Sequence, residues 1–321
     1  MKNIRIKFVG RFATRDKQDF IEVLNKRYKV VETEDPDFIF YGDSDFSYLN
    51  YECIRIFYTG ECITPNFNEC DYAIAFDHIK YGDRYARIPL YNLFQYKKNY
   101  EKLKIQRKFT ESDLRKKKGF CNFVVSNCFA FDKRSIFYDE LSKYKKVASG
   151  GRYRNNVGGP VKDKLEFQRD YKFSIAFENC SHSGYTTEKI MEAFVAGTIP
   201  IYYGDPDVAK DFNPNAFVNV HDYPSFEAAI ERVKEIDNND ELYIKMMNES
   251  PINPDVRIDD FESFLYNIFD QPLEKAPRRP HSMYTKKYEE VLKRHAFFEE
   301  IIYRNYAKVK RTLYRIFTRN Y

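Results

Sequence analysis

The chain lacks the sequence features of several protein classes. Its 321 residues include no tryptophan and only 12 glycines, and no apolar run approaches the length of a membrane-spanning helix. The amino-terminal segment MKNIRIKFVG has the pattern of a strand rather than of a signal peptide. We therefore expect neither a transmembrane helix nor a cleaved leader.

Common metal-binding and phosphate-binding motifs are also missing. The six cysteines form no CxxC pair and show no histidine spacing typical of zinc, so we expect reduced thiols. The most informative loop of the chain contains neither GxGxxG nor GxxxxGK[ST]. What the chain does have is 27 tyrosines, 29 phenylalanines and 43% hydrophobic residues, which at this length predict two domains with buried cores.

Residues 171–204 contain that loop and the clearest pattern in the chain. An apolar run from Lys172 to Phe177 predicts a strand, and residues 198–203 predict a second one. Between them, helical spacing predicts a helix that Thr186 caps and Gly197 ends. Strand, helix and strand form a βαβ unit with parallel strands. Ligands bind outside the carboxyl ends of such strands, where the loop 178–186 lies.

The first turn of this helix carries Glu188 and Lys189. A helix N-terminus has free N–H groups and a partial positive charge, so it attracts phosphate. Lys189 adds a compact positive charge for a diphosphate, and Glu188 can accept hydrogen bonds from sugar hydroxyls. The alternative interpretation is a solvated first turn without a ligand.

Short apolar runs alternate with helical patterns elsewhere. Strands are expected at residues 4–9, 38–41, 54–58, 72–76, 123–126 and 217–220, and helices at 17–25, 133–144 and after Ser225. This alternation predicts two α/β halves with mainly parallel sheets. The basic segment 91–118 is interpreted as an interdomain or acceptor-side segment.

Several segments together resemble one enzyme family. The patterns F-E-N-x(5)-Y-x-T-E-K and A-G-x-I-P-I-x-x-G, within residues 177–204, resemble the donor-binding signature of the α-1,3/4-fucosyltransferases of glycosyltransferase family 10. The segments TGECITPNFNECDYAIAFD, DRYARIPLY, GGRYRNNVG and VAKDFNPNAFVNV also resemble the short bacterial enzymes of the Lewis-antigen type, in the same order. The resemblance covers roughly residues 1–270.

This resemblance implies a GT-B glycosyltransferase fold, with two Rossmann-like domains facing a cleft. It implies an acceptor-binding domain at 1–120 and a GDP-fucose-binding domain at 121–274, and the charge of residues 275–321 sets them apart as a carboxyl-terminal tail. The implied reaction is inverting, metal-independent transfer of L-fucose from GDP-β-L-fucose to a hydroxyl of GlcNAc or Glc. The product would carry an α-1,3 or α-1,4 linkage in a lipopolysaccharide O-antigen or similar glycan, so the expected partners are GDP-fucose and an oligosaccharide acceptor.

The resemblance also implies roles for individual residues. Glu61, in the T-G-E after the strand at 54–58, matches the proposed general base, with Glu52, Glu69 and Asp71 as alternatives nearby. The implied donor-binding residues are Arg134 and Lys189 for the diphosphate, Asn179, Tyr185 and Glu188 for fucose and ribose, and Arg154 as a second arginine. Arg134 could instead be a surface arginine, and Tyr185 a packing residue.

Asp205-Pro206-Asp207 has the form of a D-x-D metal site, because two carboxylates after a strand can hold Mg²⁺ or Mn²⁺. We expect no metal there. Lys189 and Arg134 already supply positive charge for the diphosphate, and the resemblance implies a fold that needs no metal for catalysis.

The basic character of the chain lies in its tail. Residues 275–321 carry 13 lysines and arginines against four glutamates, whereas the whole chain carries +5. Helical spacing from Tyr284 to Phe317 predicts a basic amphipathic helix that either binds an anionic inner-membrane surface or packs back on the enzyme. We expect a cytoplasmic protein, peripheral on the inner membrane, and no heptad repeat supports dimerisation.

Two rival functions stay open. One is a GT-B transferase that uses a different nucleotide sugar. The other is a basic nucleic-acid-binding protein, but the chain has no helix-turn-helix, zinc or RRM signature, so we expect no nucleic-acid partner.

Overall fold

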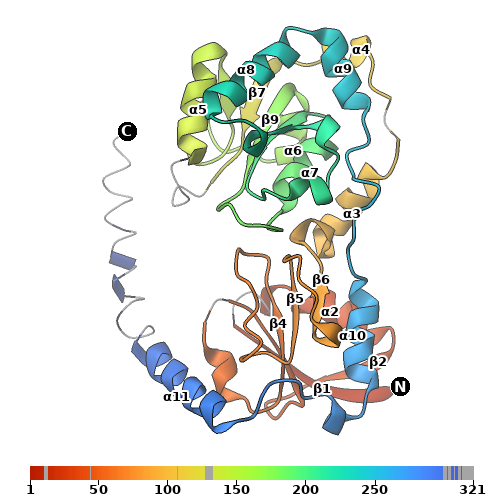
Figure 1. The fold of residues 1–321 in the computed structure, drawn as a ribbon, viewed down its shortest axis with the longest axis vertical. Coiled ribbons are helices and arrows are strands. Elements are labelled where there is room, and N and C mark those ends of the chain that lie inside the picture. The colour runs from red at the N-terminus through yellow and green to blue at the C-terminus, as the bar shows by residue number, and fades with distance from the viewer. Residues whose placement is uncertain are drawn as a thin grey trace. The chain divides into compact units, whose positions relative to one another are not determined.

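The computed structural model describes residues 1–10, 14–43, 45–106, 108–126 and 133–298, and a few isolated residues of the tail. The chain forms two compact α/β units (Figure 1). Unit 1 consists of Met1–Ala75, Lys80–Ala86 and Asp260–Tyr321, and unit 2 of Phe76–Ile79 and Arg87–Asp259. Among the described residues, no helix combines the length and the apolar character needed to span a bilayer.

A six-stranded sheet with the order β2-β1-β3-β4-β5-β6 forms the centre of unit 1. Its strands are β1 (Lys2–Val9), β2 (Tyr28–Glu32), β3 (Phe38–Tyr41), β4 (Ile54–Tyr58), β5 (Tyr72–Ala75) and β6 (Tyr85–Arg87). Strands β1 to β5 pair in parallel. The apolar runs of β3, β4 and β5 are buried along their whole lengths, as expected for parallel strands covered on both faces.

Aromatic contacts and helices cover the two faces of this sheet. On one face lie α2 (Lys17–Asn25) and α10 (Phe261–Asp270), where Phe20 meets Phe40 and Phe38 meets Phe269 with ring centroids 4.7 and 4.6 Å apart. The core of the other face includes Tyr48 and Leu49 of a short 3-10 helix, η1 (Ser47–Asn50), and Leu292 of α11 (Met283–Phe298) packs against it.

The sheet of unit 2 has five strands in the order β11-β10-β9-β7-β8, and every pair is parallel. These strands are β7 (Gly119–Phe123), β8 (Val147–Ser149), β9 (Tyr171–Phe177), β10 (Ile199–Tyr203) and β11 (Val218–Asn219). Because the strands are parallel, the carboxyl ends of β9 and β10 lie at the same edge of the sheet.

Helices cover both faces of the second sheet as well. One core contains side chains from α5 (Lys133–Tyr144), α8 (Phe226–Asp237) and α9 (Asp240–Asn248), and the other contains side chains from α3 (Phe94–Leu103) and α7 (Glu188–Val195). The short helices α4 (Glu111–Arg115) and α6 (Lys164–Arg169) complete the described α-helices of this unit.

Two sequence-based assignments differ from the structure. The strand expected at residues 123–126 lies earlier in the chain, as β7 (Gly119–Phe123), where Cys121 and Asn122 pair with Phe173 and Ser174 of β9. The segment 91–118 is not an interdomain connection, since Tyr100 and Leu103 of α3 share a core with Ile190 of α7.

The compact units also differ from the expected boundaries near residues 120 and 274. The chain passes from unit 1 to unit 2 between Ala75 and Arg87, and it returns to unit 1 at Asp260. The return has a physical cause, because α10 places Phe269 against Phe38 of the first sheet. The acceptor and donor roles of the two halves stay predictions.

The first part of the tail packs on unit 1. Arg55 of β4 is fully buried, and its Nη1 donates to Oε1 of Glu289 on α11 at 2.7 Å. The Tyr288 hydroxyl donates to Glu69 Oε1 at 3.0 Å, so a second residue of α11 also bonds to this part of unit 1. Of the two interpretations of the tail, packing on the enzyme is the one that holds for Met283–Phe298. Most of the predicted helix beyond Phe298 lies outside the described residues. Membrane binding by the tail stays a prediction.

We expect Glu289→Gln to destabilise the full-length protein, because Arg55 would keep a buried positive charge without a carboxylate partner. Removing one member of a buried ion pair typically costs about 3–5 kcal/mol, and partial solvent access should reduce this to roughly 2–3 kcal/mol. Urea denaturation measures the change, with the exposed neighbour Glu290→Gln as the matched control. Equal unfolding free energies for the two variants would show that the Arg55–Glu289 pair does not hold α11.

Candidate functional site

The loop after β9 is built around one buried carboxylate, Glu178. Its Oε1 accepts from the Thr187 N–H at 2.8 Å, and its Oε2 accepts from Lys189 Nζ at 2.8 Å. Gly204, just after β10, passes so close that a Cβ on it would lie 2.4 Å from Glu178 Cγ. Glycine at position 204 is thus what leaves room for the Glu178 side chain.

The start of α7 differs by one residue from the sequence-based expectation. The N-cap residue is Thr187 rather than Thr186. The Thr186 hydroxyl donates to Asp205 Oδ2 at 3.0 Å and so helps to anchor the loop. Gly197 follows the end of α7 with a φ of +71°, as its proposed stop signal requires.

Lys189 lies between two carboxylates, with Nζ at 2.8 Å from Glu178 Oε2 and 3.6 Å from Glu188 Oε1. Burial lowers the pKa of Lys189, but the two carboxylates outweigh burial and raise the pKa above its ordinary value. For Glu188, burial favours the neutral form, yet Lys189 and Lys164 lower the net pKa. Lys189 therefore stays protonated at neutral pH, with most of its charge balanced locally.

Arg134, in the first turn of α5, supplies a cation with unused hydrogen-bonding capacity. The residue is 5% exposed, and its Nη2 is buried without a hydrogen-bond partner among the described residues. Burial lowers the pKa of its guanidinium, and the charge of Glu178 opposes that effect. A buried, unpaired guanidinium nitrogen is costly, so this position favours a ligand that brings acceptor oxygens.

The other predicted donor residues occupy different surroundings. Tyr185 is buried, with its ring 5.1 Å from that of Phe76, and Asn179 is half-buried directly after Glu178. Arg154 forms an ion pair with Asp139, and its Nε donates to the Tyr153 hydroxyl at 3.2 Å. Electrostatic interactions thus link Arg134, Glu178 and Lys189, whereas Arg154 has a carboxylate partner of its own.

The two aspartates of the D-x-D sequence hold the loop. Asp205 Oδ1 accepts from the N–H groups of Gly184 and Asp207 at 2.8 and 2.7 Å. Asp207 Oδ2 accepts from the Ser183 hydroxyl at 2.5 Å. Burial raises the pKa of Asp205. These bonds account for both aspartates as anchors of the loop that carries Tyr185.

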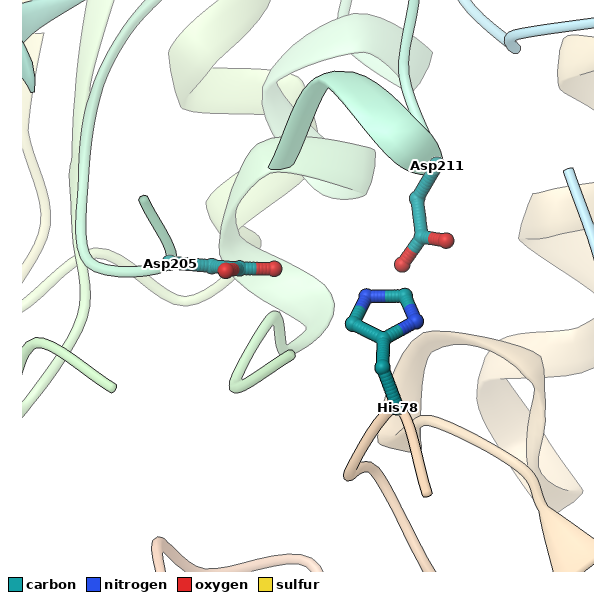
Figure 2. Close-up of side chains that lie close together, drawn as sticks. All are labelled: His78, Asp205 and Asp211. Atoms are coloured by element: carbon teal, nitrogen blue, oxygen red, sulfur yellow. The ribbon is translucent and has the colours of Figure 1, made fainter. Parts of the chain in front are cut away.

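Asp205 also belongs to a group with His78 and Asp211, whose ligand atoms all lie within 4.8 Å of one another (Figure 2). Arg87 binds Asp211 through two hydrogen bonds, Nη1 to Oδ1 at 3.0 Å and Nη2 to Oδ2 at 2.6 Å. A cation at this position would face the buried guanidinium of Arg87. We interpret the group as an ion-pair network, and metal independence stays a prediction.

In unit 1, the loop after β4 carries Glu61. Its N–H donates to Thr59 Oγ1 at 3.0 Å, and the same hydroxyl donates to Asp43 Oδ2 at 2.6 Å. Burial raises the pKa of Asp43. The sequence-based interpretation missed Asp43, although Gly42-Asp43 follows an apolar strand just as Gly60-Glu61 does. The sequence-based interpretation also gave Glu178 no role. That carboxylate is buried against Gly204, a contact between separate segments that the local sequence does not show.

The alternatives to Glu61 lie elsewhere. Glu52 and Asp71 precede β4 and β5, so they lie at the amino ends of the strands, whereas Glu61 follows a carboxyl end. Asp71 is buried and accepts from the N–H groups of Arg278 and Arg279 at 2.7 and 2.8 Å. Glu69 accepts from the hydroxyls of Tyr48 and Tyr288. These partners give Asp71 and Glu69 structural roles, and Glu61 as the base stays a prediction.

The chain has two α/β units, and in unit 2 Arg134 and Lys189 lie near the loop at the carboxyl edge of a parallel sheet, an architecture of the GT-B type. Residues 6–94 match the family model described as the alpha-(1,3)-fucosyltransferase FucT N-terminal domain. Residues 114–248 match that of glycosyltransferase family 10 (fucosyltransferase), C-terminal part. The chain belongs to glycosyltransferase family 10, the fucosyltransferases, which confirms the resemblance seen in the sequence.

Individual relatives agree with the family models. Over 267 residues the chain is 39% identical to alpha-(1,3)-fucosyltransferase FucT of Helicobacter pylori. The matched region covers 72% of this chain and 55% of the relative. The chain thus spans about half the length of that curated protein. A crystal structure of alpha1,3-fucosyltransferase with GDP-fucose superimposes with a TM-score of 0.71 at 33% identity, covering 88% of this chain and 94% of the other. The corresponding structure with GDP gives a TM-score of 0.72 at 34% identity, covering 86% and 92%.

Proposed function

We propose that the protein transfers L-fucose from GDP-β-L-fucose to a glycan hydroxyl, with inversion and without a bound metal. The observation that carries this proposal is the buried Nη2 of Arg134, which has no partner among the described residues and lies in the electrostatic surroundings of Glu178 and Lys189. The relatives solved with GDP and GDP-fucose support a nucleoside diphosphate as the group that fills this need.

In this proposal, unit 2 binds the donor. Arg134 and Lys189 neutralise the negative charge that develops on the diphosphate as the bond from fucose C1 to the phosphate oxygen breaks. The N-terminus of α7 adds backbone N–H groups and a partial positive charge. Glu188, Asn179 and Tyr185 hold the fucose and the ribose, and Arg154 has a lesser role because Asp139 already pairs with it.

Unit 1 supplies the base. The Glu61 carboxylate takes the proton of the acceptor hydroxyl while the hydroxyl oxygen forms its bond to fucose C1, and the electron pair of the broken bond leaves with GDP. The Thr59 hydroxyl positions the backbone of Glu61, which gives the threonine of T-G-E a structural purpose. The acceptor we propose is a GlcNAc or Glc residue of an oligosaccharide, with an α-1,3 linkage preferred over α-1,4.

The proposal is tested by incubating the full-length protein with GDP-fucose and either lactose, N-acetyllactosamine or a type 1 disaccharide, in EDTA. We expect a fucosylated product from at least one acceptor, with the linkage assigned by NMR. UDP- and CDP-sugars serve as comparison donors. Transfer from one of these donors but not from GDP-fucose would overturn the donor assignment. Activity that appears only when Mn²⁺ replaces EDTA would overturn metal independence.

We expect Arg134→Ala and Lys189→Ala each to weaken GDP binding, because each removes a charge-assisted contact to the diphosphate. Such contacts are worth about 1.5–3 kcal/mol, which corresponds to roughly 10- to 150-fold in Kd. Isothermal titration calorimetry measures the change. Lys143→Ala removes a cation from the exposed side of the same helix α5 and should leave the Kd unchanged. Unaltered GDP affinity in both site variants would remove them from the diphosphate site.

We expect Glu61→Gln to lower transfer by roughly 10²–10⁴-fold, the usual contribution of a general base, because glutamine cannot take the hydroxyl proton. GDP-fucose affinity should stay the same, since the proposed donor contacts all belong to unit 2. Steady-state transfer rates and donor Kd values, measured side by side, separate the two effects. Glu52→Gln, at the amino end of β4, is the control. A parallel loss of donor binding would instead give Glu61 a structural role.

A further inference from the structure

A short segment from the amino-terminal part of the chain belongs to unit 2. Phe76–Ile79 directly follows β5, whose residues belong to unit 1, yet the segment forms one compact unit with Arg87–Asp259. Phe76 and Asp77 are buried. Unit 2 is therefore not built from the carboxyl-terminal part of the sequence alone, and the contacts of this segment lie close to the proposed donor site.

The segment packs against the loop that carries Tyr185. The ring of Phe76 meets the ring of Tyr185 edge-on, with centroids 5.1 Å apart and an interplanar angle of 65°. Gly184 passes so close to the Phe76 carbonyl that a Cβ on Gly184 would lie 2.8 Å from the carbonyl oxygen. Gly184 also has a φ of +81°, which glycine adopts at little cost. The ring and the backbone of Phe76 therefore both contact the loop, at Tyr185 and at the residue before it.

The backbone of Phe76 is itself held by Arg87, which is buried. The Nε of Arg87 donates to the carbonyl oxygen of Phe76 at 3.0 Å. Its Nη1 and Nη2 bind the buried carboxylate of Asp211, and Nη1 also donates to the carbonyl oxygen of Arg257 at 3.0 Å. Because all three nitrogens of the planar guanidinium have partners, its direction is fixed, and the position of the Phe76 carbonyl is fixed with it.

The chain after β10 supports the same loop. Asp205 Oδ1 accepts from the Gly184 N–H at 2.8 Å, and Asp211 comes shortly after, behind the 3-10 helix η4 (Val208–Lys210). His78, two residues after Phe76, lies beside both aspartates (Figure 2). Gly184 is thus held by a hydrogen bond to Asp205 and by van der Waals contact with Phe76. Both supports lead back to residues 205–211, the second of them through Arg87.

We propose that Phe76 and Arg87 are positioning residues for the donor. Phe76 sets the position of Tyr185, and Arg87 holds Phe76 in place. The inference rests on the proposed function, because it takes Tyr185 to contact the fucose or the ribose of GDP-fucose. Phe76 and Arg87 do not touch the donor in this proposal and act on it only through the loop.

Hydrogen exchange tests the support of the loop without any donor. In the full-length protein, we expect Phe76→Leu to speed exchange of the backbone amides of residues 182–187 by roughly twofold to tenfold, as expected for the loss of one aromatic contact. Mass spectrometry of peptides that span the loop measures the rates. Phe173→Leu is the matched control, because Phe173 is also buried in unit 2 and its ring meets that of Tyr243 edge-on at 5.8 Å. Unchanged loop exchange in Phe76→Leu, or equal acceleration in Phe173→Leu, would overturn the proposal.

A double-mutant cycle measures whether Phe76 acts through Tyr185. We expect Phe76→Leu to weaken GDP-fucose binding by roughly twofold to tenfold in the otherwise wild-type protein, and to have no further effect when combined with Tyr185→Leu. Arg87→Lys keeps a positive charge beside Asp211 but has no Nε to bind the Phe76 carbonyl, so its effect should depend on Tyr185 in the same way. Calorimetry gives the Kd values.

The outcomes separate this inference from the proposed function. Equal effects of Phe76→Leu with and without the Tyr185 side chain would mean that Phe76 supports the fold in general, and would overturn the positioning role. If the wild type binds no GDP-fucose but Phe76→Leu still speeds exchange of the loop, the proposed function fails while the support of the loop by Phe76 stands.

Discussion

The buried ion pair between Glu178 and Lys189 is the interaction on which the site of unit 2 depends. Glu178 follows the end of β9, and Lys189 is the second residue of α7, so the pair ties a strand end to a helix start. A carboxylate without solvent is costly unless it is paired and hydrogen-bonded. Glu178 meets that requirement with the N–H and hydroxyl of Thr187 as well as with Lys189. The nine residues between Phe177 and Thr187 must therefore leave and rejoin the sheet edge at fixed points.

Charge balance around this pair explains why the site favours an anion. Lys189 shares its charge with Glu178 and Glu188, so it contributes little net positive field by itself. Arg134 is different, because one of its buried nitrogens has no partner within the described chain. An oxyanion at Arg134 would satisfy that nitrogen and also lie near the protonated lysine. Two cations and two carboxylates thus make a site that is neutral when empty and still attracts a diphosphate.

Much of the fold could be predicted from local patterns, and the misses have physical causes. Buried parallel strands such as β4 appear in the sequence as continuous apolar runs. The helix expected at residues 133–144 is α5, since the spacing of apolar residues along the sequence is enough to indicate a helix. The cap of α7 was assigned to the wrong one of two adjacent threonines, since both give the same local signal. Asp43 was overlooked for a similar reason, because its contact with Thr59 joins two different strand ends. Local chemistry indicated only Glu188 and Lys189, in the first turn of a helix, and the other site residues came from the family resemblance.

The tail was the hardest part to predict, because one buried arginine decides its position. Arg55 lies in the apolar run IRIFY, where the sequence alone does not show that its guanidinium is buried, and its partner Glu289 is 234 residues away. Once α11 is docked through Glu289 and Leu292, this side of the helix cannot also face a membrane. Val291 and Phe298 stay exposed on α11, so a membrane surface would have to contact these residues rather than Glu289 and Leu292. An amphipathic pattern in the sequence could not separate these sides, because packing on the protein and binding to lipid both favour apolar residues at helical spacing.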